Sequence, residues 1–294
     1  MVGRLESTAV PIDPKTVTVF LDASPSGKRR AAHAATLAQR WGAHLVGVHV
    51  VFDGVSLHPS MCYARGHHAI EQVIIDAQEL DVVAEAASVL VGNHFRALRA
   101  RLNVPGEFRP IRRGSTAEEA ILSSLHSDLV VVGHPKPHGL PDDMAPERIL
   151  LASGVPLLIV PNAWGGETIG HKVLIGWNGS REARRAVSDA MTFLVAAESV
   201  TVLVIDPSRN RRYGDGPGDD IAQHLVRHGA HVEVAEVASH GSPIAQVILG
   251  YAVESASDLL VVGAYSHARL RELLLGGATR TLLACMPVPV LISR

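Results

Sequence analysis

Short apolar runs alternate with longer, partly polar stretches along the whole chain of 294 residues. The runs TVTVFL and KVLIGW, which begin at Thr16 and Lys172, each end in a polar turn and precede a stretch rich in alanine and arginine. A second apolar run follows in each half, LVGVHVV in the first and SVTVLVI in the second. Runs of this length predict strands, and the stretches between them predict helices. Each half therefore begins with a predicted βαβ unit.

The same order of elements continues through both halves. Ser115 with Glu118 fits a capping box, and Ser242 before Pro243 fits an N-cap with proline at the first helical position. The nearly identical runs DLVVVG and DLLVVG come next, and VPLLIV and VPVLIS close the halves. Unbroken apolar runs are typical of parallel strands that are buried on both faces. The repeat predicts an α/β protein with two tandem repeats of a doubly wound, mostly parallel five-stranded sheet.

A glycine-rich connector, PNAWGGETIGHK, lies between the halves and has the composition of a linker. We therefore predict a first domain over residues 1–162, a linker over 163–171 and a second domain over 172–294.

Composition narrows the class of protein. Hydrophobic residues make up 47% and charged residues 19%, which excludes a disordered chain. The net charge of −2 provides no basic field for nucleic acid or an anionic membrane, and no apolar run approaches the ~20 residues of a membrane span. Cys62 and Cys285 belong to no CxxC pair, so we expect reduced thiols in a cytoplasmic protein.

Candidate ligand contacts follow the predicted strands of the second half. In an open parallel sheet, ligands bind beyond the carboxyl ends of the strands, where helix N-termini present N–H groups. The candidates after a strand or at a glycine-rich helix start are Trp177, Asn178, Gly179, Ser180, Gly263, Ser266, Gly276, Gly277 and Thr279. A glycine pair lets backbone amides approach a phosphate, and a threonine adds a hydroxyl donor. Gly276 and Gly277 also suit a simple connection between helices, and Ser180 also suits an N-cap.

Signatures of catalysis and of metal binding are missing. The chain contains no G-x-S-x-G elbow and no H-E-x-x-H motif, and Gly27-Lys28 lacks the upstream glycine of a P-loop. His134 and His138 are separated by two prolines, which prevents a regular helix from aligning them. We therefore predict no catalytic residues, no metal site and a protein that is not an enzyme.

Taken together, the D/N-x-S turn after the first strand, the Gly-Ser helix start, the DLLVVG strand and the closing VPVL strand resemble the universal stress protein family. The resemblance covers nearly the whole chain twice and implies a fold like that of the adenine-nucleotide alpha hydrolases. It also implies ATP binding in some members, through G-x-x-G followed nine residues later by G-[ST]. Here Gly263 and Gly276 match that pattern, whereas Ser266 and Gly277 replace the second glycine and the Ser/Thr. Asn178 replaces the acidic residue that ATP-binding members usually carry.

The first half differs from the second in which parts of the nucleotide-binding pattern it retains. It keeps the acidic residue, Asp22, and the following Ser24, which are the weaker candidates for nucleotide contacts. Ser24 also suits an N-cap, and Asp22 also suits a balance of the local charge of Lys28, Arg29 and Arg30. After its DLVVVG strand, however, it has no glycine pair and carries Asp142, Asp143 and Glu147, which repel phosphates. We expect this half to bind triphosphate poorly or not at all.

The resemblance implies a non-enzymatic stress-response protein that binds ATP or a related adenine nucleotide, with Mg accompanying it, through the second domain. Two alternatives remain open: a ligand-free protein-interaction module and a slow nucleotide hydrolase. In the family, domains commonly pair through their last strands, so Val155–Val160 and Val288–Ser293 are the expected antiparallel contact within the chain. A homodimer and an unidentified protein partner are further expectations.

Overall fold

The computed structural model describes residues 13–51, 67–112, 117–134, 146–207, 216, 218–264, 282–283 and 285–294, and the side chains of all of these except 67–81, 112, 117–118 and 120. These residues form two compact units. The first is Lys15–Ser153, and the second is Gly154–Arg294 together with Asp13 and Pro14.

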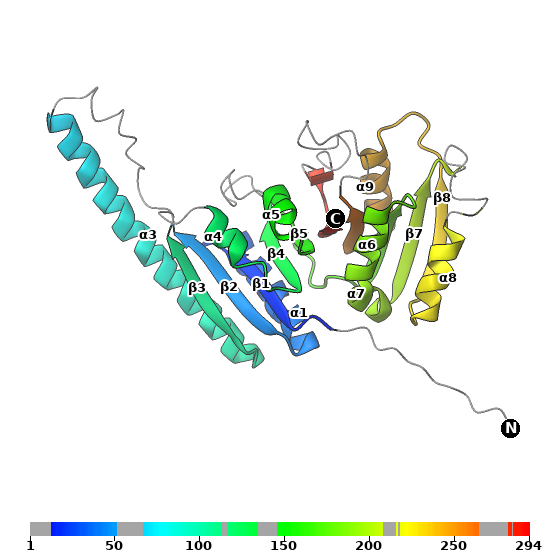
Figure 1. Cartoon of the computed structure of the whole chain (residues 1–294), viewed down its shortest axis with the longest axis horizontal. Helices are drawn as coiled ribbons and strands as arrows, with labels where there is room; N and C mark the ends of the chain where they lie inside the picture. Colours follow the sequence, from blue (N-terminus) through cyan, green and yellow to red (C-terminus); the bar gives the residue numbers. More distant parts are fainter. Residues whose placement is uncertain are drawn as a thin grey trace. The chain divides into compact units, whose positions relative to one another are not determined.

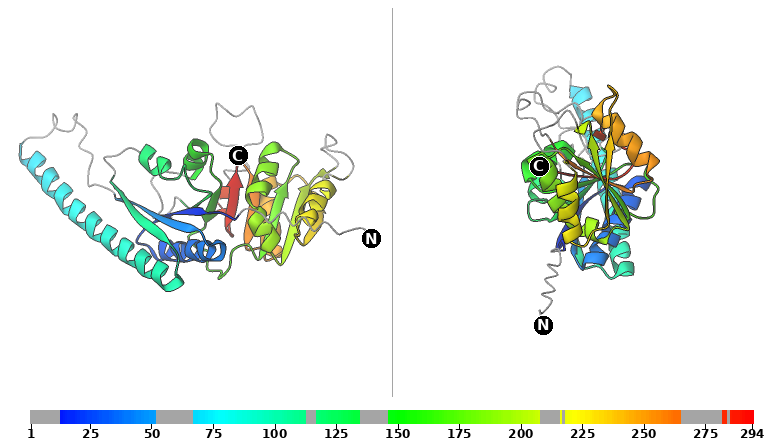
Figure 2. Two further views of the ribbon diagram at one scale, coloured as in Figure 1. Left: turned by 60° about the horizontal axis from the view of Figure 1, so that its bottom comes forward. Right: turned by 90° about the vertical axis from the view of Figure 1, so that its right-hand side faces the viewer.

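The first unit contains a parallel sheet with strand order β3-β2-β1-β4 (Figure 1). Its described elements are β1 (Thr16–Leu21), α1 (Pro25–Trp41), β2 (His44–Val51), α3 (His67–Leu102), β3 (Gly106–Arg112), α4 (Ala117–Leu122), β4 (Leu129–Gly133) and α5 (Pro146–Ser153). The central strand β1 pairs on both sides, since Val19 lies opposite Gly47 of β2 and Val131 of β4. Helices α1 and α3 contact each other on one face, and α4 and α5 contact each other on the other (Figure 2). This is the doubly wound arrangement that right-handed crossovers produce.

The second unit repeats this order and adds two strands, β5 and β10. Its described elements are β5 (Leu157–Val160), β6 (Lys172–Trp177), α6 (Arg181–Asp189), α7 (Met191–Ala196), β7 (Ser199–Ile205), α8 (Asp219–Arg227), β8 (Val232–Val237), α9 (Ile244–Glu254), β9 (Leu259–Gly263) and β10 (Val290–Ser293). The strand order is β5-β10-β9-β6-β7-β8, and every pair in it is parallel except β5 with β10. The predicted α/β class, the mostly parallel sheets and the tandem repeat are therefore confirmed.

The antiparallel contact expected between the closing strands is present. Leu158 of β5 lies opposite Leu291 of β10, and both are fully buried. This pairing includes β5 in the second compact unit, whereas the sequence assigns it to the first domain. The unit boundary follows α5 at Gly154, whose φ of +67° only glycine adopts readily. The domain limits at residues 162 and 172 remain predictions.

The first helix of each unit begins at a predicted serine N-cap. The Ser24 hydroxyl accepts a hydrogen bond from the Gly27 amide at 2.9 Å, and the Ser180 hydroxyl accepts one from the Ala183 amide at 3.1 Å. Each bond satisfies one of the amides that a helix start leaves without an internal partner. The capping box at Ser115 lies outside the described residues.

The predicted N-cap at Ser242 is wrong. Helix α9 begins at Ile244 with Pro243 as its N-cap residue and no side-chain capping bond. The Ser242 amide instead donates to the Ser239 carbonyl at 2.8 Å, closing a turn in which Gly241 has a φ of +85°. Because Ser242 belongs to this turn, the helix begins one residue later than predicted.

Buried strands form the core of each unit. Every residue of β4, β5 and β10 is buried, as the unbroken apolar runs predict for parallel strands with helices on both faces. In the first unit, Phe95 of α3 is fully buried and reaches β2, where a Cβ on Gly47 would lie 2.7 Å from the phenylalanine ring. Glycine at this position therefore lets α3 pack closely against the sheet.

Candidate functional site

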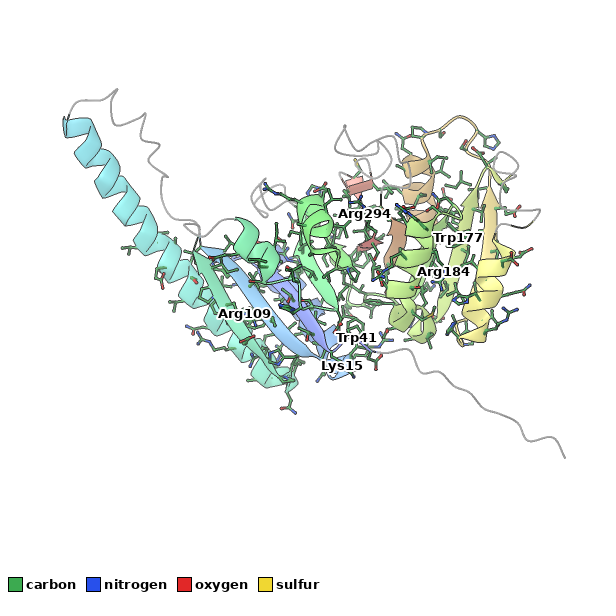
Figure 3. The ribbon with its side chains drawn as sticks, viewed as in Figure 1. Lys15, Trp41, Arg109, Trp177, Arg184 and Arg294 are labelled. Carbon is green, nitrogen blue, oxygen red and sulfur yellow. The ribbon has the colours of Figure 1, made fainter. Side chains whose placement is uncertain are left out.

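The carboxyl ends of β6 and β9 lie side by side at the point where the strand order of the second unit reverses. The chain runs from β6 outward to β7 and β8, then returns to β9 on the other side of β6. Gly176 is paired with Val262, so Trp177 and Gly263 come next along the two strands at this edge. Figure 3 labels Trp177. A reversal of this kind opens a crevice above the sheet, which is where doubly wound proteins bind ligands.

The turn after β6 is fixed by local hydrogen bonds. The Asn178 Oδ1 accepts from the Ser180 amide at 3.1 Å, and Gly179 between them has a φ of +67°. Asn178 is exposed, whereas Trp177 and Ser180 are half-buried. The turn thus presents a carboxamide at the strand end and places the N-terminus of α6 directly behind it.

Gly263 is required by the close approach of α6. A Cβ at this position would lie 2.4 Å from the Ala183 nitrogen and from the Glu182 carbonyl carbon, both of which are backbone atoms. The next residue, Ala264, is fully buried, and its amide donates to the Ser293 carbonyl at 2.8 Å. The end of β9 is therefore tightly packed between α6 and β10.

Glu182 is a component of this edge that the sequence analysis missed. Its side chain is buried, which raises the pKa of the carboxyl, but hydrogen bonds and the charge of Arg181 outweigh this and leave that pKa lowered. The Arg181 Nε donates to the Glu182 Oε1 at 2.6 Å. The carboxylate lies in the first turn of α6, where the helix dipole favours negative charge. The sequence signal that could have indicated Glu182 is an acidic residue two positions after the N-cap serine.

The structure brings together five predicted contacts of the second half, which are Trp177, Asn178, Gly179, Ser180 and Gly263. The remaining four, Ser266, Gly276, Gly277 and Thr279, lie outside the described residues. Where the chain is described, no three His, Cys, Asp or Glu side chains are grouped to hold a metal ion.

The corresponding edge of the first unit has the same turn. Asp22 follows β1 as Asn178 follows β6, and its Oδ1 accepts from the Ser24 amide at 2.9 Å and from the Ser24 hydroxyl. The hydrogen bond between Asp22 and the Ser24 amide therefore reproduces that between Asn178 and the Ser180 amide. The two edges differ in what lies against the turn.

A buried arginine fills the edge between β1 and β4. Arg30 of α1 is 3% exposed, forms an ion pair with Asp22 Oδ2 and donates from Nε to the Phe20 carbonyl at 3.1 Å. A Cβ on Gly133, at the end of β4, would lie 2.1 Å from the guanidinium. Burial lowers the pKa of Arg30, and the charge and hydrogen bond of Asp22 oppose that lowering. Of the three basic residues that follow Ser24 in the sequence, Lys28, Arg29 and Arg30, the ion pair of Asp22 is with Arg30.

Of the three acidic residues expected to repel phosphates in the first half, Glu147 lies in the first turn of α5, while Asp142 and Asp143 lie outside the described residues.

A family model for the universal stress protein family matches residues 170–294. These residues belong to the universal stress protein family. The universal stress protein Slr1230 of Synechocystis sp. is 27% identical over 149 residues, which is 50% of this chain and 50% of that protein. The chain thus spans about half the length of this curated relative.

Solved structures extend the likeness in fold to both halves. A universal stress protein from Archaeoglobus fulgidus DSM 4304 superposes with a TM-score of 0.67 and 16% identity, over 95% of this chain and 96% of that one. A functionally unknown protein from Pseudomonas aeruginosa PAO1 gives a TM-score of 0.57 and 15% identity, over 95% and 92% of the two chains. These identities show the fold alone. They agree with the expected tandem repeat of one fold, since the first half has the strand order of the second.

Among the described residues, no helix combines the length and the apolar character needed to cross a membrane.

Proposed function

We propose that this universal stress protein binds one adenine nucleotide per chain, as a Mg complex, at the carboxyl edge of β6 and β9, and that it acts as a cytoplasmic, non-enzymatic stress-response protein. The observation that carries the proposal is the contrast between its two edges. The first is filled by the Arg30 guanidinium, whereas the second presents the exposed Asn178 turn.

The chemistry of the second edge suits an adenine base. A carboxamide both donates and accepts hydrogen bonds, as the edge of adenine does, and the Ser180 amide orients it through Oδ1. Trp177, half-buried beside it, supplies an aromatic surface. The glycine pair Gly276-Gly277 and Thr279 are the proposed phosphate contacts. Binding without turnover is the proposed activity, since the sequence carries no catalytic signature.

Calorimetric titration of the full chain with Mg-ATP, after removal of carried-over nucleotide, tests the proposal. We expect one site per chain in the wild type and no binding in the double variant Gly276→Asp, Gly277→Asp, because two carboxylates repel the phosphates. Gly165→Asp is the matched control, since a Cβ at Gly165 has nothing within 4 Å. It should bind like the wild type.

A second variant tests the base contact. Asn178→Ala removes the carboxamide, and we expect about a tenfold loss of affinity, the effect of one hydrogen bond of ~1.4 kcal/mol. Two nucleotide sites per chain would contradict the proposal that Arg30 prevents binding at the edge of the first unit. If titration with Mg-ATP gives no heat of binding at either of two temperatures, the ligand-free interaction module is favoured. If the wild type releases more inorganic phosphate than the double variant, the slow hydrolase is favoured.

A further inference from the structure

Helix α3 is apolar on two opposite faces, and only one of them packs against its own unit. Val91, Phe95 and Leu98 are buried and lie on the face toward the sheet, where α3 contacts β2 and β3. On the outer side, Val82, Val83, Val89 and Leu90 are 69%, 65%, 50% and 68% exposed. Figures 1 and 2 show the N-terminal part of α3 projecting past the end of the sheet.

The exposed residues form one continuous stripe. At 100° per residue, positions 82, 83, 86, 89 and 90 fall within an arc of about 120°. The exposed Ala97 and Ala100 continue the same stripe, so that it runs about 27 Å at 1.5 Å per residue. Asn93, the polar residue within it, accepts a hydrogen bond from Arg96. A surface helix normally turns a polar face to water, and a contiguous apolar surface marks a contact with a partner. We call this surface the outer stripe.

The charges along α3 favour one particular partner. The sequence from His67 to Glu85 carries five carboxylates and no lysine or arginine, namely Glu71, Asp76, Glu79, Asp81 and Glu85. The sequence from Ala86 to Leu102 carries Arg96, Arg99 and Arg101 and no carboxylate. Two copies of this helix side by side in parallel would bring like charges together, whereas an antiparallel pair brings each acidic half to a basic half.

We propose that the outer stripe is the interface with a second copy of this chain, with the two α3 helices packed antiparallel about a two-fold axis near Ala86. Such an interface is isologous, because the same surface is used by both copies. Each residue of one helix then lies level with the residue of the other helix that is equally far from the axis on the opposite side. An axis at residue 86 places Val82 level with Leu90 and Asp76 level with Arg96. The small side chains of Ala86, Ala97 and Ala100 allow the helices to approach closely. At 36 residues, α3 is about 54 Å long and provides room for this contact.

Sedimentation equilibrium of the full chain over a series of concentrations tests the interface. We expect a monomer-dimer equilibrium in the wild type. Val83→Glu with Leu90→Glu should raise the dissociation constant about tenfold or more, because both carboxylates would enter an apolar contact. The matched control is Val253→Glu on α9, which introduces the same charge at a residue of similar exposure, 60%. The control should dimerise like the wild type.

Single cysteines test the orientation in a Cys62→Ser, Cys285→Ser background. Ala86→Cys lies at the proposed axis, so oxidation should link the two copies through this position. Ala97→Cys lies level with residue 75 of the other copy and should not form such a link. Linking at both positions indicates parallel helices and overturns the antiparallel pairing.

Three further outcomes would overturn the interface itself. These are a wild-type chain that remains a monomer at every concentration, a dimer that the double variant leaves intact, and a dimer that the Val253→Glu control weakens equally. None of these measurements involves nucleotide, so the result is independent of the proposed binding site.

Discussion

Asp22 and Arg30 form an asymmetric ion pair at the carboxyl edge of the first unit. The Asp22 side chain is 27% exposed and can be hydrated, whereas Arg30 is buried and cannot. Removing one partner of a pair costs most when the charge left behind is buried. The two members of this pair should therefore differ in their effect on stability.

Asp22→Ala should lower the free energy of unfolding of the first unit by about 2–3 kcal/mol, because it leaves a buried guanidinium without its counter-charge. Arg30→Met replaces that guanidinium with an apolar chain and should cost about 1 kcal/mol or less. Urea denaturation followed by Trp41 fluorescence, the tryptophan of that unit, measures both. Equal losses for the two variants would contradict the asymmetry.

Two corresponding aspartates anchor the start of the first strand in each unit. Asp258 accepts hydrogen bonds from the amides of Gly170, His171 and Lys172 and from the Thr168 hydroxyl, at 2.9–3.1 Å. Asp128 accepts from the amides of Lys15 and Thr16, at 2.8 and 2.9 Å. Each lies just before the strand that pairs with the one it anchors.

Asp258→Asn should lower the stability of the second unit by about 2–3 kcal/mol. The amide nitrogen of asparagine is a donor, so it cannot accept hydrogen bonds from the backbone N–H groups that it would face. Asp128→Asn affects only two such hydrogen bonds and should lower the stability of the first unit by about 1 kcal/mol. Hydrogen exchange resolved by segment distinguishes the two units. A larger loss for Asp128→Asn would refute the proposed basis of the difference.

Residue patterns predicted contacts that depend on neighbours in the sequence and missed those that depend on the fold. The turns Asp22-Ser24 and Asn178-Ser180 were predictable because an Asx side chain two residues before an amide has few other partners. The position of Arg30 was not, because several arginines follow Ser24 and only the packing of α1 selects the one that faces Gly133.

At the scale of elements, strands with unbroken apolar runs were predictable, whereas the outer strands β3 and β8 were not. The strands that carry unbroken apolar runs, β1, β4, β6 and β9, agree with their predicted positions within one residue. Strand β8 is half exposed, and β3 reads GEFRPIR, so neither carries an apolar run. The sequence analysis singled out neither of them. The long helix α3 was not predicted either, since its two apolar faces blur the helical period.

The antiparallel contact of β5 and β10 should be sensitive to charge. Val290 is fully buried and lies opposite Ile159 of β5. Val290→Lys would bury an unpaired ammonium there and should lower the stability of the second unit by several kcal/mol, about 3 or more. Thermal unfolding by calorimetry measures the change. Val253→Lys, at an exposed site, is the control, and an unchanged transition in Val290→Lys would count against this contact.

At the scale of the whole molecule, one fold occurs twice with different chemistry at the same edge. Both units place a polar turn after one central strand, β1 or β6, and a glycine as the last residue of its neighbour, β4 or β9. Gly133 accommodates a guanidinium, whereas Gly263 accommodates the backbone of α6. The expectation that the first half binds triphosphate poorly came from its missing glycine pair and stays a prediction. The buried Arg30 guanidinium is a second, independent reason for it. A protein with one filled and one polar edge is expected to hold one ligand rather than two.

The two units also carry separate histidines that couple stability to pH. In the first, burial and Arg29 lower the pKa of His33 below its ordinary value of 6.5. In the second, burial, Arg184, His228 and Arg227 lower the pKa of His224 from the same value. The His224 ring contacts His228 with centroids 4.7 Å apart. Each histidine is therefore more readily protonated in the unfolded chain than in the folded one.

Between the folded pKa and about 6.5, the unfolded chain binds more protons, so stability rises with pH. The stabilisation is complete above about pH 6.5 and is lost as the pH falls toward the folded pKa, with a slope of at most ~1.4 kcal/mol per pH unit for each histidine. His33→Gln should flatten this slope for the transition reported by Trp41 and leave the second unit unchanged. His224→Gln should do the reverse. Urea unfolding at several pH values from 5 to 7.5 measures both slopes, and a slope that neither variant alters would show that other groups dominate acid destabilisation.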